Sequence, residues 1–307
     1  MTPSRVRVSR ETQQPPRFSI SQVSTLTASF ADDVRAYAAA GVDGIGIWEM
    51  KLGEGSLEEF QASGLGAATA VPLVPSIQPL PLLPGPDSVR ERVDSLLRSL
   101  EVLAPYAPSA ILCFTGPGDR ETAVAGVREV AREAERLGLR LAVEPFQLEG
   151  IESWSILNTL GDAAEFIDDV GSDAVGIQFD VWHLWNTETL FDDIAGQVDR
   201  FAGVHLGDRR LATRGFADRA VPGEGVAGVP HILAALDEAG WDGLYDIEIF
   251  SDDGTLGASY EDSLWRLAPE EAAVLLRDAF RACWDARTDL PPSPSSDREL
   301  RRLTMKE

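Results

Sequence analysis

Four short apolar runs in the sequence each end in an acidic or imidazole side chain of the kind that binds metal ions. The runs RLAVE, VGIQFD, FAGVH and LYDIE end at Glu144, Asp180, His205 and Glu248. These residues are 36, 25 and 43 positions apart, near the ~30 residues that one strand-and-helix unit occupies in a (β/α)8 barrel. Because parallel strands of a barrel end at one rim, the pattern predicts that the four side chains meet at its C-terminal face.

The remainder of the chain alternates between expected strands and helical patterns. The helical stretches have apolar residues at i, i+3, i+4 and i+7, and three of them end at Gly41, Gly138 and Gly240, as the position after a helix favours. The expected strands are residues 17–23, 44–48, 67–74, 109–114, 140–144, 175–180, 201–205 and 244–249. Strands that alternate with helices pair in parallel through right-handed crossovers. We therefore expect an α/β protein that folds as a (β/α)8 TIM barrel.

The length and composition are consistent with a single domain. The 307 residues, 44% hydrophobic and 25% charged, can bury one large core. We expect a disordered tip over 1–16, the barrel over 17–287 and a loose Pro/Ser-rich tail over 288–307. No stretch of ~20 apolar residues and no apolar leader is present, so we expect a cytoplasmic protein without a membrane partner. Cys113 and Cys283 lack the spacing of a metal ribbon and are expected to be buried thiols.

The charge of the chain restricts its partners. The formal net charge is −23, and an acidic surface repels a phosphate backbone. We therefore expect no nucleic acid partner.

A proline-rich segment interrupts the alternation. Residues 71–86 contain six prolines, too many for a helix or a central strand. We expect a stiff loop over the rim after the third strand, either as a spacer or as an apolar wall of the pocket.

The four ligand-type residues together suit a divalent metal ion. A mixed nitrogen and oxygen set accepts Mn²⁺, Mg²⁺, Co²⁺ or Zn²⁺, and the excess of carboxylates favours Mn²⁺ or Mg²⁺. Singly, a carboxylate at a strand end is often a helix cap, and a lone histidine is often a core residue. Four such residues on consecutive units favour a metal site.

Further candidates lie next to these ligands. His183 follows Asp180 by three residues and can bond a substrate hydroxyl or a ligand carboxylate, or cap the next loop. Trp48, Trp182 and Trp185 fall at expected rim positions, where flat rings can stack on a sugar.

The run HLGDRR places two more candidates just beyond the third predicted rim residue, His205. Asp208 and Arg210 leave the strand directly after a ligand. We expect both to contact the substrate.

These motifs occur in a fixed order along the chain. They are Glu144-Pro145, the D-x-x-H of Asp180 and His183, the V-H-L-x-D of His205 and Asp208, the P-G-E-G of 222–225, and the I-E-I around Glu248. Together they resemble the sugar phosphate isomerase/epimerase family, which are xylose isomerase-like TIM barrels. The likeness covers about residues 18 to 280.

The resemblance implies one divalent metal ion, commonly Mn²⁺, bound by Glu144, Asp180, His205 and Glu248. In ketose 3-epimerases of this kind the first and last of these glutamates also form the acid/base pair. A carboxylate then removes the proton α to a carbonyl, and the metal stabilises the enediolate. The implied substrate is a small keto-sugar or glycoside, and we expect a homo-oligomer.

One departure from the family pattern leaves the substrate open. Ketose 3-epimerases usually place an arginine six residues after the metal-binding histidine, where this chain has Leu211, so Arg209 or Arg210 would have to substitute. The tryptophans and the proline loop favour a bulkier or more apolar ligand. That pattern also resembles the catalytic subunits of C-glycoside deglycosidases, which act on 3-keto glycosides and would imply a small accessory subunit, and it is compatible with inosose dehydratases.

Three functions therefore remain open. In the lyase alternative His183, with an ordinary pKa of ~6.5, would protonate the leaving group near neutrality. A non-catalytic sugar-binding barrel is the third alternative. A DNA-repair endonuclease of this fold needs a histidine-rich zinc cluster, and the chain has only three histidines.

Overall fold

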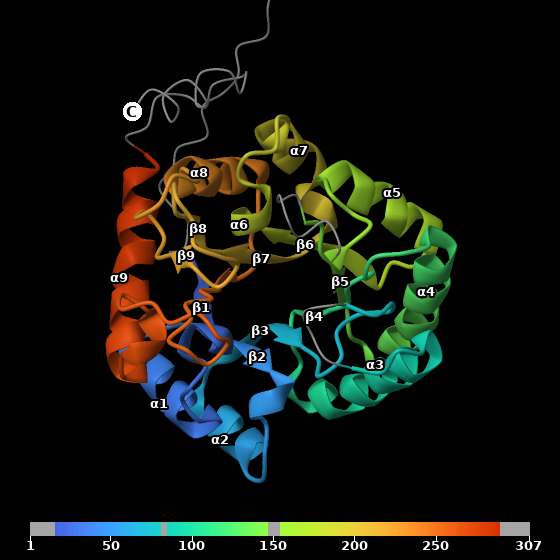
Figure 1. Cartoon of the computed structure of the whole chain (residues 1–307), viewed down its shortest axis with the longest axis horizontal. Helices are drawn as coiled ribbons and strands as arrows, with labels where there is room; N and C mark the ends of the chain where they lie inside the picture. The colour runs from blue at the N-terminus through green and yellow to red at the C-terminus, as the bar shows by residue number, and fades with distance from the viewer. Residues whose placement is uncertain (1–15, 81–84, 147–153, 289–307) are drawn as a thin grey trace, which may run out of the picture.

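Eight parallel strands close into a barrel surrounded by helices (Figure 1). The computed structural model describes residues 16–80, 85–146 and 154–288. The barrel strands, in chain order, are β1 (Phe18–Ser21), β2 (Gly44–Trp48), β3 (Gly66–Val71), β4 (Ala110–Leu112), β5 (Leu141–Val143), β6 (Val175–Asp180), β7 (Phe201–Leu206) and β10 (Tyr245–Ile247). Each strand pairs with its neighbours along the chain, and β1 pairs with β10 to complete the ring.

The helices, with one exception, cover the outside of this ring. They are α1 (Phe30–Ala40), α2 (Ser56–Ser63), α3 (Val89–Leu103), α4 (Arg120–Leu137), α5 (Leu160–Val170), α6 (Val181–Leu184), α7 (Leu190–Gln197), α8 (Val229–Ala239) and α9 (Pro269–Ala286). The exception is the short α6, which follows β6 at the C-terminal rim (Figure 1). The expected glycine ends are confirmed, because Gly41, Gly138 and Gly240 all adopt the left-handed conformation after α1, α4 and α8. None of the helices in the described parts of the chain is long and apolar enough to cross a membrane.

The sequence predicted the order of the barrel strands. All eight expected strands form, with ends that differ by three residues at most, so the TIM barrel is confirmed. The short antiparallel hairpin of β8 (Asp208–Arg209) and β9 (Arg219–Ala220) was not expected. Residues 1–15 and 289–307, which make up most of the expected tip and tail, lie outside the described residues, as do 81–84 of the proline segment.

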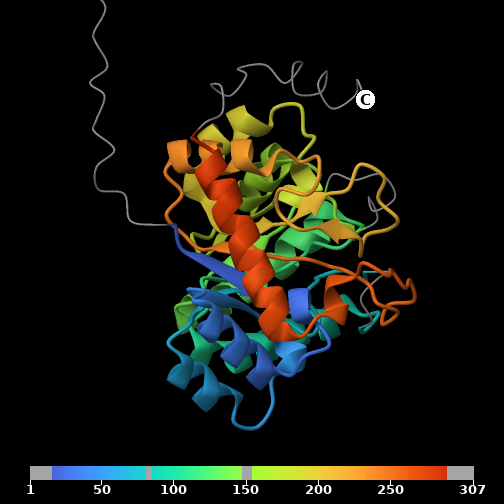
Figure 2. The ribbon, with the colours of Figure 1, turned by 90° about the vertical axis from the view of Figure 1, so that its left-hand side faces the viewer.

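The main hydrophobic core lies between the barrel wall and the helices. Helix α9 crosses the outside of the barrel (Figure 2) and covers the seam between β1 and β10. There Phe280 stacks on Phe18 at a centroid distance of 4.7 Å and contacts Tyr245 at 5.8 Å. Cys113 and Cys283 are buried free thiols, as predicted.

The barrel interior contains polar side chains at several levels. Thr69 donates a hydrogen bond to Gln178, and Ser19 donates one to Asp246. The register of strand pairing sets the level of side chains along the barrel axis. Pairing of β6 with β7 aligns Asp180 with His205, and pairing of β7 with β10 aligns His205 with Asp246. Three neighbouring strands therefore carry ionisable side chains at one level near the C-terminal rim.

Candidate metal centre

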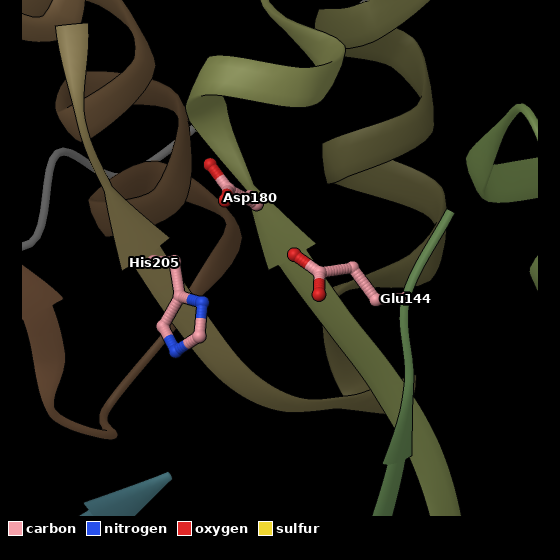
Figure 3. A group of neighbouring side chains, drawn as sticks. All are labelled: Glu144, Asp180 and His205. Atoms are coloured by element: carbon pink, nitrogen blue, oxygen red, sulfur yellow. The ribbon is translucent and has the colours of Figure 1, made fainter. Parts of the chain in front are cut away.

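Three buried side chains meet at the C-terminal rim with their ligand atoms close together. One oxygen of Glu144, one of Asp180 and one ring nitrogen of His205 all lie within 4.8 Å of one another. Figure 3 shows the two carboxylates and one ring nitrogen of His205 turned toward a common region. Each side chain is at most 3% exposed, so water can satisfy little of their hydrogen-bonding capacity.

Strand ends position each of these groups. Glu144 follows β5 directly, and Asp180 is the last residue of β6, where its Oδ1 caps α6 by accepting from the Trp182 amide at 2.7 Å. Glu248 follows β10, and its Oε2 lies 3.4 Å from His205 Nδ1. The structure thus brings the four predicted ligand residues together at one rim.

An arginine that the sequence reasoning missed lies among the carboxylates. Arg219 is 4% exposed, and its Nη1 lies 2.9 Å from Asp180 Oδ2 and 3.1 Å from Glu248 Oε2. Its guanidinium also lies 4.8 Å from the centroid of the Trp182 ring and 4.9 Å from that of Phe250. A buried cation between two carboxylates offsets part of their mutual repulsion.

Burial and neighbouring charges shift the proton affinities of the cluster. The pKa of Glu144 is raised well above its ordinary value by burial and by the carboxylates of Asp180 and Glu248, with Arg219 opposing. Burial also raises the pKa values of Asp180 and Glu248, and Arg219 again opposes. Burial lowers the pKa of His205 to about 4. The imidazole is therefore neutral at pH 7, the form that binds metal ions.

The donor set fits a divalent cation. Glu144 Oε1 and His205 Nδ1 are buried and have no hydrogen-bond partner among the described residues, although buried polar atoms are normally paired. Three carboxylates, those of Glu144, Asp180 and Glu248, face one guanidinium, which leaves a formal excess of two negative charges. A divalent ion balances that charge and satisfies both orphaned atoms.

His183 lies beside this cluster, in an environment that differs from the one expected for a proton donor. Its Nε2 is 3.4 Å from Arg219 Nη2 and 3.6 Å from Asp180 Oδ2, and its ring packs edge-on against Phe146. Burial and the positive charge of Arg219 lower its pKa well below the ordinary value. The expectation of a pKa suited to proton donation near neutrality is therefore wrong for this environment.

The three tryptophans occupy three different environments. Trp182 is 2% exposed and lies under the guanidinium groups of Arg209 and Arg219. Trp185 is half-buried and packs against the main core. Trp48 is half-buried at the end of β2, with its ring edge-on to Phe250 at 5.8 Å. Trp48 and Trp185 are thus the half-buried members of the three, and Trp182 is the buried one.

Asp208 organises the loop after β7. Its Oδ1 accepts from the amides of Arg209 and Ala227, and its Oδ2 from those of Gly223 and Gly225, at 2.8–3.0 Å. A side chain at Gly225 would come within 2.4 Å of Asp208 Oδ1, which explains the second glycine of P-G-E-G. Both carboxylate oxygens are committed to the loop backbone, so the expectation that Asp208 binds substrate is not supported by its contacts.

Arg210 also points into the loop structure. Its Nε lies 2.9 Å from Asp218 Oδ1, and its Nη2 lies 3.2 Å from Asp262. Arg214 joins the same two aspartates. This ion cluster ties the β8–β9 loop to the loop after β10, and both project from the same side of the barrel (Figure 2). Arg210 is thereby engaged away from the carboxylate cluster.

Arg219 forms ion pairs with the carboxylate cluster, and no such pair is found for Arg209 or Arg210 among the described residues. It lies 14 residues after His205, because the hairpin extends the loop. The β9 strand and a hydrogen bond from the Arg219 amide to Phe250 O hold it over the barrel. Counting a fixed spacing from His205 could not find it, because the hairpin adds residues between His205 and Arg219.

The proline segment contributes an apolar surface near the cluster. Leu80 is buried with Phe114 and Phe146 in a second apolar cluster against which Trp48 and Trp154 pack. The role of the segment, as a spacer or as an apolar wall of the pocket, stays a prediction.

Comparisons with known proteins agree with this architecture. The model of the xylose isomerase-like TIM barrel family matches residues 34–277. The D-psicose 3-epimerase of Enterocloster bolteae is 34% identical over 166 residues, which cover 53% of this chain and 51% of that protein. The inosose isomerase of Halalkalibacterium halodurans is 25% identical over 154 residues, 49% of this chain and 50% of that protein.

A solved structure extends the likeness of fold to nearly the whole chain. The IolI protein with a bound zinc atom superposes with a TM-score of 0.72 at 18% identity, covering 89% of this chain and 100% of that one. The chain spans about half the length of the curated relatives it matches. The match of the family model over most of the barrel shows that the chain belongs to the xylose isomerase-like TIM barrel family.

Proposed function

We propose that this protein is a divalent-metal-dependent sugar epimerase or isomerase that removes a proton α to a carbonyl. One observation carries the proposal: Glu144, Asp180 and His205 form a buried group at the barrel rim, and Glu144 Oε1 and His205 Nδ1 have no hydrogen-bond partner among the residues that the structure describes. Similarity to a D-psicose 3-epimerase and to an inosose isomerase supports a keto-sugar or keto-cyclitol substrate.

The chain offers the ligands for a metal ion and the groups for proton transfer. Glu144, Asp180, His205 and Glu248 would hold the ion, and Mn²⁺ suits this carboxylate-rich set, with Mg²⁺, Co²⁺ and Zn²⁺ as alternatives. When bound, the ion would supply Lewis-acid stabilisation of the negative charge that develops on the substrate oxygens.

We propose that two carboxylates act on opposite sides of the substrate. Glu144 follows β5 and Glu248 follows β10, and β6 and β7 lie between these strands in the ring. One carboxylate takes the proton from the carbon α to the carbonyl, and the other delivers a proton to the opposite face, so that the configuration inverts without net change in atoms. Arg219 keeps positive charge beside the oxygens where anionic character develops.

The inosose reaction is the second candidate because of the similarity to inosose isomerase. A lyase needs a group that protonates the leaving atom. His183, the expected candidate, is buried against Phe146 and Arg219 and has a lowered pKa. This environment favours the epimerase or isomerase over the lyase.

Isotope exchange tests the proposal. The purified protein is stripped with EDTA, reloaded with Mn²⁺ and incubated in D₂O with D-psicose, D-fructose, an inosose or a 3-keto glycoside. We expect deuterium at the α carbon of at least one keto-sugar or inosose, loss of this exchange with EDTA, and recovery with Mn²⁺. Glu144→Gln should abolish exchange, and Glu101→Gln, an exposed carboxylate on α3, should not.

Two results would contradict the proposal in different ways. Exchange that survives complete metal removal would refute the metal centre. A loaded protein that exchanges no substrate would instead support the non-catalytic sugar-binding barrel. Repeating the assay with any small protein encoded beside this chain tests the accessory subunit expected for the deglycosidase alternative.

A further inference from the structure

We propose that Asp246 is a positioning residue for His205: its carboxylate holds the Nε2 side of the imidazole and so keeps Nδ1 free to bind the metal ion. This inference rests on the proposed metal centre. Asp246 lies in β10 two residues before Glu248, and side chains two apart on a strand share one face. It is 1% exposed and has no part in the proton transfer described above.

The two ring nitrogens of His205 face different carboxylates. Pairing of β7 with β10 aligns His205 with Asp246, and His205 Nε2 lies 3.7 Å from Asp246 Oδ2. The other nitrogen, Nδ1, lies 3.4 Å from Glu248 Oε2. In Figure 3 one nitrogen turns toward Asp180 and Glu144 while the other turns away. The ring therefore has a metal-facing side and an Asp246-facing side.

The hydrogen bonds of Asp246 leave one oxygen for His205. Ser19 Oγ donates to Oδ1 at 2.8 Å, whereas Oδ2 is a buried oxygen without a hydrogen-bond partner among the described residues. A separation of 3.7 Å exceeds a hydrogen bond, so the proposed contact requires the imidazole to move toward Oδ2. His205 Nε2 is the ring nitrogen that faces this orphaned acceptor.

Strand β2, which is separated from β10 by β1 in the barrel, leaves space for this carboxylate. A side-chain carbon on Gly46 of β2 would lie 2.3 Å from Asp246 Oδ2 and 2.9 Å from the Cα of Ser21. Such distances are far below van der Waals contact, so β2 requires glycine at this position while Asp246 occupies its place. The barrel wall is thus shaped around the same oxygen that faces His205.

An acceptor on one side of a neutral imidazole selects its tautomer. The neutral ring carries one N–H, so a carboxylate at Nε2 leaves the lone pair on Nδ1. The same contact fixes the orientation of the ring and raises its basicity as a ligand. Loss of such a partner typically weakens metal affinity by ~10–100-fold.

The first test measures Mn²⁺ affinity directly. In Asp246→Asn, a nearly isosteric change, we expect the Mn²⁺ dissociation constant from chelator competition to rise by ~10-fold or more. The melting temperature without metal should stay close to the wild-type value. Ser19→Ala is the matched control, because it removes the partner of Oδ1 and no atom that faces His205. It should change the affinity much less.

The outcomes separate this inference from the proposed function. Tight Mn²⁺ binding by the wild type with equal affinity in Asp246→Asn would overturn the role of Asp246 and leave the metal centre intact. An equal loss in Ser19→Ala would overturn it as well, because the effect would not run through His205. A wild type that binds no Mn²⁺ would overturn both proposals.

The second test does not depend on whether a variant of Asp246 folds. The chain has only three histidines, so ¹⁵N-histidine labelling gives few ring signals, and His205→Gln identifies those of His205 by omission. Glu248 Oε2, which lies 3.4 Å from Nδ1, already accepts a hydrogen bond from Arg219 Nη1 at 3.1 Å, whereas Asp246 Oδ2 has no other donor among the described residues. We therefore expect His205 of the metal-free wild type to be the Nε2–H tautomer. The Nδ1–H tautomer would refute the proposed contact.

Discussion

Replacing Arg219 by methionine tests the electrostatic balance of the carboxylate cluster. The side chain is 4% exposed, and its Nη1 lies 2.9 Å and 3.1 Å from oxygens of Asp180 and Glu248. Removing one partner of a buried ion pair costs ~3–5 kcal/mol, because it leaves uncompensated buried charge. At ~2–4 °C per kcal/mol for a domain approaching this size, the metal-free variant should melt roughly 10 °C below the wild type.

Metal binding should respond in the opposite direction. Arg219 repels a divalent ion in the same cluster, so its loss leaves a more negative site that binds the ion more tightly. A ligand at 100 times its dissociation constant adds ~2.7 kcal/mol of stability, and at equal Mn²⁺ concentration the variant should gain more. Thermal melts in EDTA and in excess Mn²⁺ measure both effects, and the Mn²⁺-induced rise should be larger in Arg219→Met than in the wild type.

Arg209→Met is the matched control. Arg209 lies over the same Trp182 ring, with its guanidinium carbon 4.6 Å from the ring centroid, but no carboxylate ion pair is found for it in the described residues. It should lose at most ~2 kcal/mol through the ring contact and show the wild-type response to Mn²⁺. The reasoning fails if Arg219→Met melts with the wild type in EDTA, or if its Mn²⁺-induced rise is no larger.

Three further substitutions test individual side chains. Glu248→Gln should lose both bound metal and activity while circular dichroism shows an intact barrel; metal at the wild-type level by elemental analysis would remove Glu248 from the site. Trp185→Ala should lower stability by ~2–3 kcal/mol, because the ring packs on the core, and leave KM nearly unchanged; an increased KM at full stability would return Trp185 to the substrate. His183→Gln should raise KM and retain α-deuterium exchange, since His183 contacts Arg219; retained exchange with product formation abolished would support the lyase.

Strand order and the level of the four ligand residues were predictable because both depend on local sequence. Apolar runs that end in Glu144, Asp180, His205 and Glu248 mark where strands stop, and parallel pairing carries them to one rim. Asp246 was also within reach, because alternation along β10 places it on the same face as Glu248. The sequence reasoning considered only the last residue of the run.

Arg219 and the roles of the tryptophans depended on contacts that no local pattern encodes. The hairpin that carries Arg219 forms through pairing of Asp208 with Ala220, and its tip is held by ion pairs to Asp262. Trp182 and Trp185 are three residues apart around one short helical turn, yet one lies under two arginines and the other faces the core. Which direction a ring takes in such a turn is decided by tertiary packing.

Asp208 accepts hydrogen bonds from four backbone amides and so fixes the base of the loop after β7. Both ends of the segment 210–218 are fixed, since Asp208 pairs with Ala220 and Arg209 with Arg219. Lengthening a loop between fixed ends has a small entropic cost, ~0.6 kcal/mol per doubling of its length. The segment can therefore accept inserted residues between its ion-paired side chains, Arg210, Arg214 and Asp218, while the arginine at its base stays in register.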